Sequence, residues 1–265
     1  MPEIHATKKS LGQHWLNDLP TLEYICEEAK INATDTVLEI GPGTGTLTNF
    51  LVKSAKKVIA VEYDQNLAQQ LPNRVKATNL QVVSQDILKF DLTKLKPNYK
   101  VVANIPYYLT SNLIRTLSES TNPPLSAVLL IQKEVAQRVA SGPGKMSLLS
   151  VSAQFYWYVG LGDVVPAKLF TPPPKVDSQV ITLARRTEPL FPEVNEKQFF
   201  RLVKAGFATR RKTLLNSLAG GLRTDKETIQ KALDVANISS GLRAQALSLD
   251  DWYTIYKIFM KSEIL

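Results

Sequence analysis

The chain has 265 residues, 44% of them hydrophobic, so it can bury a sizeable core and carry a second, smaller domain. Its single cysteine, Cys26, excludes an internal disulfide framework, and the lack of a signal-like run or of about 18 consecutive uncharged apolar residues predicts a soluble, cytoplasmic protein with no membrane partner. The formal charge is +8, and residues 185–265 carry +5 of it, from 14 Lys and Arg against 9 Asp and Glu, which favours an anionic partner such as a nucleic acid.

Short apolar, β-branched runs alternate with amphipathic stretches up to residue 184. The runs that predict strands are 36–40, 57–61, 80–84, 100–103, 127–132, 150–159 and 178–184. Because they lack polar alternation, they indicate strands covered on both faces, as in a parallel sheet. Helix-length segments over 47–55 and 66–71 separate the early runs, which predicts an α/β fold of βαβ units. The last two runs predict an antiparallel hairpin at the sheet edge.

A glycine-rich stretch follows the first run. The sequence EIGPGTGTLT places Gly41, Gly43 and Gly45 between a predicted strand and a predicted helix, where glycine allows a tight turn and close approach of a ligand. The spacing G-x-G-x-G departs from the G-x-G-x-x-G of dinucleotide folds. Glu39 precedes the loop, and a carboxylate attracts the amine of S-adenosylmethionine. The loop therefore favours that cofactor over a nicotinamide dinucleotide.

Acidic side chains follow the next two runs. Glu62 ends the second run, near the spacing of about 20 residues at which a carboxylate binds both ribose hydroxyls. Asp86 follows the third run, where it can accept a hydrogen bond from an adenine amino group. Taken singly, each is more commonly a solvated loop carboxylate. Together, at successive strand ends, they favour a cofactor site, because ligands of open α/β sheets bind at that edge.

The fourth run leads into Asn104-Ile105-Pro106-Tyr107. The exocyclic amine of adenine is a poor nucleophile, because its lone pair is delocalised into the ring. The Asn104 side-chain oxygen and the backbone carbonyl of Ile105 or Pro106 can accept its two hydrogens and favour the pyramidal geometry needed for attack. Tyr107 offers a ring on which the base can stack. The motif thus predicts methyl transfer to an adenine amine, promoted by position and electrostatics.

Phe170 is a candidate for the opposite wall of the base pocket. It stands just before a run of three prolines, 172–174, which stiffens the backbone. Taken alone, Phe170 would be interpreted as a core residue, so this assignment depends on the motif around Tyr107.

Helical periodicity replaces the strand pattern after residue 184. The predicted helices are 195–207, 210–222, 225–236 and 248–260. Asp225 and Ser248 are predicted N-caps, and Gly220-Gly221 is a predicted C-cap. The sequence therefore predicts an α/β domain over 1–184 and a small all-helical domain over 185–265.

These motifs together resemble the small-subunit ribosomal RNA adenine dimethyltransferases over nearly the whole chain. The resemblance is carried in order by KKSLGQHWL, EIGPGTGTLT, Glu62, QDI, NIPYY, IQKEVAQRV, FTPPPKVDS, ATRRKTLLNSL and LRAQALSLDDW. It implies a Rossmann-like, S-adenosylmethionine-dependent methyltransferase domain followed by a helical RNA-binding domain. It also implies N6,N6-dimethylation of two adjacent adenosines in the 3′-terminal hairpin loop of 16S rRNA, with a role in small-subunit biogenesis.

The resemblance assigns roles to individual residues. The implied cofactor-binding residues are His14, Leu16, Gly41, Gly43, Glu62, Asp86, Ile87 and Asn104. The implied catalytic residues, around the target base, are Asn104, Pro106, Tyr107 and Phe170. The implied phosphate contacts are Lys8, Lys9, Lys145, Lys175, Arg210, Arg211 and Lys212. The implied partner is 16S rRNA within the immature 30S subunit, bound by a monomer that needs no metal.

Two features depart from the family pattern. Trp15 stands where the family usually has Phe, a change that keeps an aromatic ring. The loop over 141–150 is shorter than the usual form, which has a Tyr-Gly pair before Leu-Ser-Val. The second departure puts RNA contacts of this loop in question but leaves the chemistry intact.

Other functions remain open at this point. Resistance methyltransferases acting on a large-subunit rRNA adenine share the chemistry, but the segments FTPPPKVDS and LRAQALSLDDW favour the small-subunit family. DNA adenine methyltransferases generally carry Asp in place of Asn104. A basic tail would also suit an assembly factor that binds immature small subunits, a role that can coexist with catalysis. A small-molecule methyltransferase predicts a lid over the pocket, and a basic helical tail is not an obvious lid.

Overall fold

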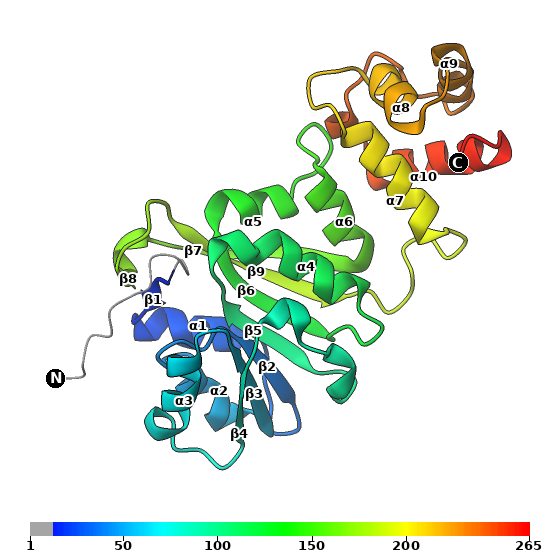
Figure 1. The fold of residues 1–265 in the computed structure, drawn as a ribbon. Coiled ribbons are helices and arrows are strands. Elements are labelled where there is room, and N and C mark those ends of the chain that lie inside the picture. The colour runs from blue at the N-terminus through cyan, green and yellow to red at the C-terminus, as the bar shows by residue number, and fades with distance from the viewer. Residues whose placement is uncertain (1–12) are drawn as a thin grey trace. The chain divides into compact units, whose positions relative to one another are not determined.

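The structure is a computed structural model that describes residues 13–265 (Figure 1). The chain divides into two compact units. The first contains the described residues up to 137 together with 157–185, and the second contains 138–156 and 186–265. The chain thus passes from the first unit to the second one residue after the boundary expected at 184, and the segment 138–156 also belongs to the second unit. Within residues 13–265, no helix is long and apolar enough to cross a membrane.

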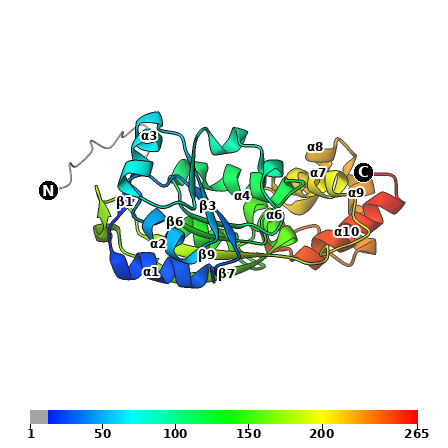
Figure 2. The same ribbon diagram turned by 90° about the horizontal axis from the view of Figure 1, so that it is seen from below.

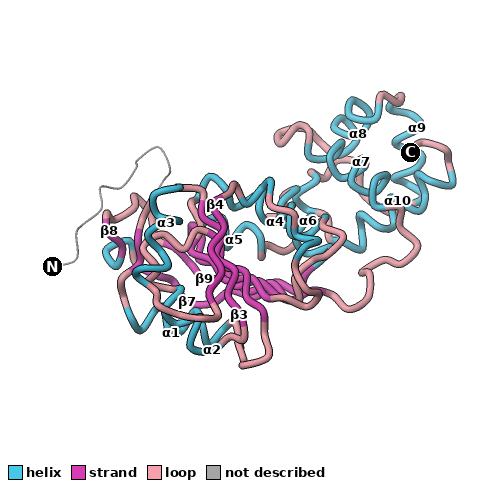
Figure 3. Tube along the Cα trace, turned by 60° about the horizontal axis from the view of Figure 1, so that its bottom comes forward, coloured by secondary structure: helices cyan, strands magenta, loops and turns pink. Residues whose placement is uncertain are grey.

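A sheet whose strands are magenta in Figure 3 forms the centre of the first unit. It has seven strands in the order β4-β3-β2-β5-β6-β9-β7. The strands are β2 (Thr36–Ile40), β3 (Lys57–Glu62), β4 (Leu80–Ser84), β5 (Lys100–Asn104), β6 (Ser126–Gln132), β7 (Trp157–Val165) and β9 (Ser178–Arg185). Strands β2 to β6 pair in parallel, and β9 pairs antiparallel with both β6 and β7. The predicted α/β class and the predicted edge hairpin are both confirmed.

Helices cover both faces of this sheet. They are α1 (Leu19–Glu28), α2 (Thr48–Ser54), α3 (Gln65–Arg74) and α4 (Thr110–Glu119), and α5 (Lys133–Val139) follows β6. Figure 2 shows α1 and α2 on one side of the strands and α4 on the other. Leu22 of α1 and Leu51 of α2 share one buried cluster with Val37, Val58 and Val102 of the strands. This double cover explains why β2, β3, β5 and β6 lack polar alternation.

A second, two-stranded sheet lies beside the carboxyl ends of these strands. Its strands are β1 (Trp15–Leu16) and β8 (Phe170–Thr171), which pair antiparallel with Trp15 opposite Thr171 and Leu16 opposite Phe170. The β7–β9 connection therefore carries a strand of its own. The β1–β8 pairing joins two segments of the chain that are about 155 residues apart in sequence.

The strand predicted over 150–159 is wrong for its first part. Residues Leu148–Tyr156 form helix α6, and β7 begins only at Trp157. Ser147 and Ser150 cap this helix reciprocally, because the Ser147 hydroxyl accepts from the Ser150 N–H (3.2 Å) and the Ser150 hydroxyl accepts from the Ser147 N–H (2.6 Å). An uninterrupted apolar run fits a buried helix as well as a buried strand. Here the reciprocal serine cap stabilises the first turn of a helix.

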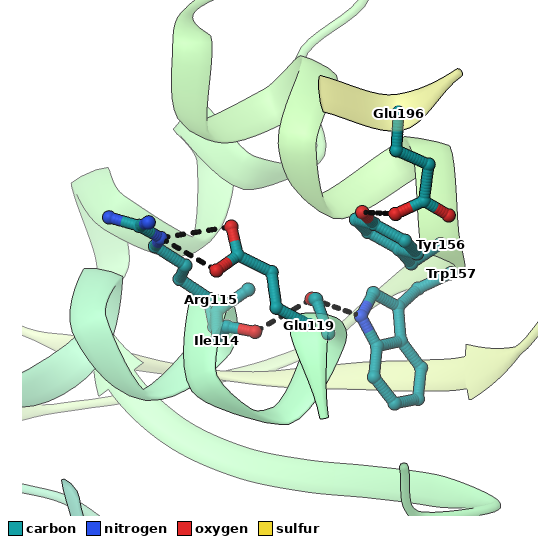
Figure 4. Close-up of polar contacts among 7 residues, drawn as sticks. Ile114, Arg115, Glu119, Tyr156, Trp157 and Glu196 are labelled. Atoms are coloured by element: carbon teal, nitrogen blue, oxygen red, sulfur yellow. Dashed lines mark hydrogen bonds and ion pairs between the residues drawn. The ribbon is translucent and has the colours of Figure 1, made fainter. Parts of the chain in front are cut away.

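The second unit is helical and contains an aromatic core. Its helices are α6, α7 (Glu196–Phe207), α8 (Leu214–Leu222), α9 (Lys226–Val235) and α10 (Leu249–Lys261). Phe155 of α6 contacts Phe191, Phe199 and Phe200 through ring packing. Figure 4 shows the neighbouring Tyr156 hydroxyl, which donates to the Glu196 carboxylate over 2.6 Å.

The N-caps predicted at Asp225 and Ser248 are confirmed. The helix predicted over 210–222 begins only at Leu214, because residues 210–213 form a turn, and the C-cap predicted at Gly220-Gly221 is wrong. Asp225 accepts from the Thr228 N–H, and Ser248 forms a capping box with the residue three positions on. Helix α8 continues through both glycines to Leu222, and its C-cap is Arg223, which takes the left-handed conformation. A Cβ on Gly221 would lie 2.6 Å from the Cβ of Ala205, so this glycine lets α8 approach α7 closely.

Candidate functional site

Strands β2 to β5 deliver the glycine loop, Glu62, Asp86 and Asn104 to one edge of the sheet, and the β1–β8 pair brings Leu16 and Phe170 beside them. The chain order reverses between β2 and β5, and the crevice at such a switch point is where open α/β sheets bind ligands. A cavity of about 840 Å³, measured with its opening to solvent, lies at this edge. Its lining includes His14, Leu16, Gly41, Gly43, Glu62, Asn104, Pro106, Tyr107 and Phe170. Asp86 and Ile87 line an adjoining cavity that shares Gly41, Glu62 and Pro106 with the first.

The glycine loop has the backbone geometry that its sequence predicts. Gly41, Gly43 and Gly45 all take positive φ angles, of 67°, 57° and 87°. A Cβ at Gly45 would also lie 2.7 Å from Leu71 and 2.8 Å from Val75, side chains carried by α3 and its C-cap. Glycine is therefore required both for the turn and for the close packing of α3 against it.

Two carboxylates beyond the glycine loop are held in fixed orientations. Glu62 accepts from the Gly43 N–H at 3.0 Å and from the Asp64 N–H at 2.8 Å. Burial raises the pKa of Glu62, and these N–H donors lower it in part. Asp86 accepts from the Leu88 N–H at 3.0 Å through one oxygen, which caps a short 3-10 turn and leaves the other oxygen to meet a ligand. Both orientations suit acceptors for ribose and adenine donors.

Glu39 is an ionisable group of the cavity without a hydrogen-bond partner among the described residues. It is 1% exposed, and neither of its oxygens has a hydrogen-bond partner among the described residues. Burial raises the pKa of Glu39 to about 8; the nearby Thr48 hydroxyl, although outside hydrogen-bond geometry, lowers it in part, and the Glu62 charge raises it further. A buried carboxyl without a partner is costly unless a ligand supplies one. The ammonium group of S-adenosylmethionine is such a partner.

Asn104 is anchored to the N-terminal segment. Its side-chain Nδ2 donates to the backbone carbonyl oxygen of His14 over 3.3 Å, which leaves Oδ1 as an acceptor at the cavity. His14 in turn is held by a 2.7 Å contact between its Nδ1 and the Pro172 carbonyl oxygen. Sequence reasoning missed this connection, because neither the contact nor the β1–β8 pairing has a local signal.

Tyr107 presents its ring to the same cavity. Its hydroxyl forms a 3.0 Å hydrogen bond with the Ser178 hydroxyl, and burial raises the Tyr107 pKa, so the phenol is neutral. The His14 ring lies nearly parallel to the Tyr107 ring, with centroids 6.0 Å apart. Phe170 is 3% exposed, so it contributes an edge of the cavity wall while most of its ring packs in the core.

Two exposed aromatic residues at the cavity mouth were not predicted. Tyr63 and Tyr108 are 63% and 64% exposed and line both adjoining cavities. Tyr108 belongs to the NIPYY motif, so its position at the end of β5 was the available signal.

The predicted phosphate contacts are dispersed. Lys175 in the first unit and Lys145, Arg210, Arg211 and Lys212 in the second are all exposed. Lys8 and Lys9 lie outside the described residues. Across residues 13–265, no group of three or more His, Cys, Asp or Glu side chains could hold a metal ion.

Comparison with known proteins agrees with this geometry. The family model described as ribosomal RNA adenine dimethylase matches residues 4–261. A protein of Dehalococcoides mccartyi named ribosomal RNA small subunit methyltransferase A is 40% identical, over 96% of this chain and 89% of its own. One of the same name from Alkaliphilus metalliredigens is 42% identical, over 94% and 90%.

Two solved structures have the same architecture. A dimethyladenosine transferase from Plasmodium falciparum aligns with a TM-score of 0.81 at 28% identity, over 94% of this chain and 98% of its own. The 23S rRNA methyltransferase ErmE aligns with a TM-score of 0.74, also at 28% identity, over 92% and 98%. The sheet order, the glycine loop and the NIPYY motif agree with these matches. The chain therefore belongs to the ribosomal RNA adenine dimethylase family, whose methyl donor is S-adenosylmethionine.

Proposed function

We propose that this protein dimethylates the N6 amines of two adjacent adenosines in the 3′-terminal hairpin loop of 16S rRNA. The observation that carries the proposal is the orientation of Asn104, whose amide nitrogen is occupied by the His14 carbonyl and whose oxygen remains an acceptor at the cavity. Relatives named ribosomal RNA small subunit methyltransferase A support the choice of the small subunit.

The backbone beside Asn104 supplies a second acceptor. The Pro106 carbonyl already accepts from the Leu109 N–H at 3.0 Å, so the Ile105 carbonyl is better placed to hold the other amine hydrogen. Two acceptors on one amine favour its pyramidal, nucleophilic form. When bound, S-adenosylmethionine supplies an electrophilic sulfonium methyl group. The neutral Tyr107 phenol then serves as a stacking surface and not as a base, because the N6 nitrogen becomes cationic and acidic when it accepts the methyl group and can release its proton to water.

The second unit offers a surface for the RNA backbone. Lys197, Arg201 and Lys204 stand at i, i+4 and i+7 on α7, where they share one exposed face and line a groove with Gly221 of α8. Among the described residues these three side chains form no ion pair with a carboxylate, whereas Lys231 on α9 pairs with Glu227. Unneutralised cations at helical spacing suit contacts to successive phosphates.

We also propose a substrate particle, an oligomeric state and a cellular compartment. The substrate is 16S rRNA within the immature 30S subunit, bound by a monomer in the cytoplasm. The net charge of +8 supports binding to so large an anionic particle.

Transfer of radiolabelled methyl groups from S-adenosylmethionine tests the proposal directly. The substrates are 30S particles lacking these methylations, naked 16S rRNA and 50S particles, and nucleosides are analysed after digestion. N6,N6-dimethyladenosine confined to the small-subunit RNA is the expected result. Label in the 50S RNA would overturn it in favour of a large-subunit activity, the second candidate that the ErmE-like fold suggests.

A further inference from the structure

The cavity contains a buried donor without a partner as well as the buried acceptor Glu39. Trp15 lines the cavity, and its indole Nε1 is buried and has no hydrogen-bond partner among the described residues. Trp157, by contrast, donates from its indole to the Ser118 hydroxyl at 2.7 Å (Figure 4). A buried N–H is ordinarily paired, so its isolation at a ligand cavity points to a ligand acceptor.

The position of Trp15 is fixed by its neighbours. It belongs to β1, which pairs with β8, and the next residue, Leu16, accepts at its carbonyl from the Thr46 hydroxyl over 3.1 Å. The Nε1 and Cδ1 atoms of Trp15 lie 3.3 and 3.4 Å from the point that a Cβ on Gly43 would occupy. The N–H edge of the indole therefore lies over the second glycine of the cofactor loop.

One backbone donor of the glycine loop is already used within the protein. The Gly43 N–H donates to Glu62 at 3.0 Å, so it is committed inside the protein. The Trp15 N–H, which lies over this glycine, has no such partner among the described residues. The amino acid end of S-adenosylmethionine is a zwitterion, and the cavity offers it one orphaned donor and one orphaned carboxyl, Glu39.

We propose that the Trp15 indole N–H donates a hydrogen bond to the α-carboxylate of S-adenosylmethionine, while Glu39 binds its α-ammonium group. A phenylalanine at position 15 would keep the ring but lose the donor. Trp15 is thus a positioning contact for the amino acid end of the cofactor.

Calorimetric binding to three ligands separates this contact from simple packing. S-adenosylhomocysteine carries both charged groups, decarboxylated S-adenosylmethionine keeps only the ammonium, and 5′-methylthioadenosine lacks both. A hydrogen bond to a charged group predicts that Trp15→Phe weakens S-adenosylhomocysteine binding about 10- to 100-fold. The same variant should leave the affinities for the other two ligands within about threefold. Glu39→Gln should weaken binding of the two ammonium ligands only.

A different pattern of binding losses in Trp15→Phe would contradict the hydrogen bond. An equal loss for all three ligands, or no loss for any, would show that Trp15 only packs against the glycine turn and would overturn the proposal. Trp157→Phe is the matched control, because its indole lies away from the cavity and bonds Ser118.

A measurement on the unaltered protein guards against a variant that fails to fold. With ¹⁵N-labelled tryptophan, the three indole N–H signals of Trp15, Trp157 and Trp252 can be followed by NMR. One of them should move downfield on addition of S-adenosylhomocysteine and remain in place with 5′-methylthioadenosine. If all three respond alike to both ligands, the carboxylate contact does not exist.

Discussion

Asn104 and His14 are joined by a hydrogen bond from the Asn104 side-chain nitrogen to the His14 backbone carbonyl oxygen, across 90 positions of sequence. This contact fixes which end of the amide faces the cavity, because a nitrogen that donates to His14 turns the oxygen the other way. The acceptor for the target amine therefore depends on a backbone atom of the N-terminal segment. A carboxylate at position 104 would lose that donor and repel the His14 carbonyl.

Replacing Asn104 with Ala should lower the single-turnover rate of methyl transfer by about 100-fold or more, the usual effect of removing one positioned electrostatic group. Binding of S-adenosylhomocysteine should change much less, and calorimetry would show this. A rate within tenfold of the unaltered protein would remove Asn104 from the group of acceptors.

Tyr107 should act through its ring. Tyr107→Phe keeps the stacking surface and loses only the hydrogen bond to Ser178, so kcat/KM should fall by no more than about tenfold. Tyr107→Ala removes the ring, and a decrease of about 5- to 150-fold is expected from base stacking worth about 1–3 kcal/mol. Equal effects of the two substitutions on 30S methylation would contradict a stacking role.

Glu39 should make the ligand-free protein less stable as pH rises. Its pKa is about 8 in the folded protein against 4.5 for an ordinary glutamate, so between these values the folded state holds a proton that the unfolded state releases. The free energy of unfolding should therefore fall with a slope of up to about 1.4 kcal/mol per pH unit from pH 4.5 towards 8. Urea unfolding at several pH values checks the slope.

Glu39→Gln is the control for this titration. The variant cannot ionise at position 39, so the fall in stability between pH 6 and 8 should become shallower. The raised pKa of Glu62 acts in the same direction and leaves a residual slope. An unchanged slope in the variant would mean that Glu39 does not titrate in this range.

The cation row on α7, formed by Lys197, Arg201 and Lys204, should set part of the salt dependence of RNA binding. Replacing these three residues together with Ala should reduce the slope of log K against log salt by about 2 to 3, roughly one for each phosphate that is no longer neutralised. Lys231→Ala is the matched control, because Lys231 already pairs with Glu227. Equal slopes for the triple variant and the control would place the RNA elsewhere.

Local patterns predicted the site better than they predicted the helices around it. The non-alternating runs specified parallel strands, and parallel strands bring their carboxyl ends to one edge, so Glu62 and Asn104 could be placed together from sequence. Gly221 was wrongly predicted as part of a C-cap, because the residue instead allows close packing against Ala205 on another helix. The link from Asn104 to His14 was invisible for the same reason, since it is a tertiary contact between distant segments.

The β1–β8 ladder has a kinetic consequence. It ties the segment that bears His14 and Trp15 to the segment that bears Phe170, so the cofactor end and the base end of the cavity share one border. Dimethylation requires a spent cofactor to leave and a fresh one to enter between transfers. We expect each exchange of cofactor to weaken the contacts that hold the target base. The residence time of the RNA on the protein would then determine whether a singly methylated product is released.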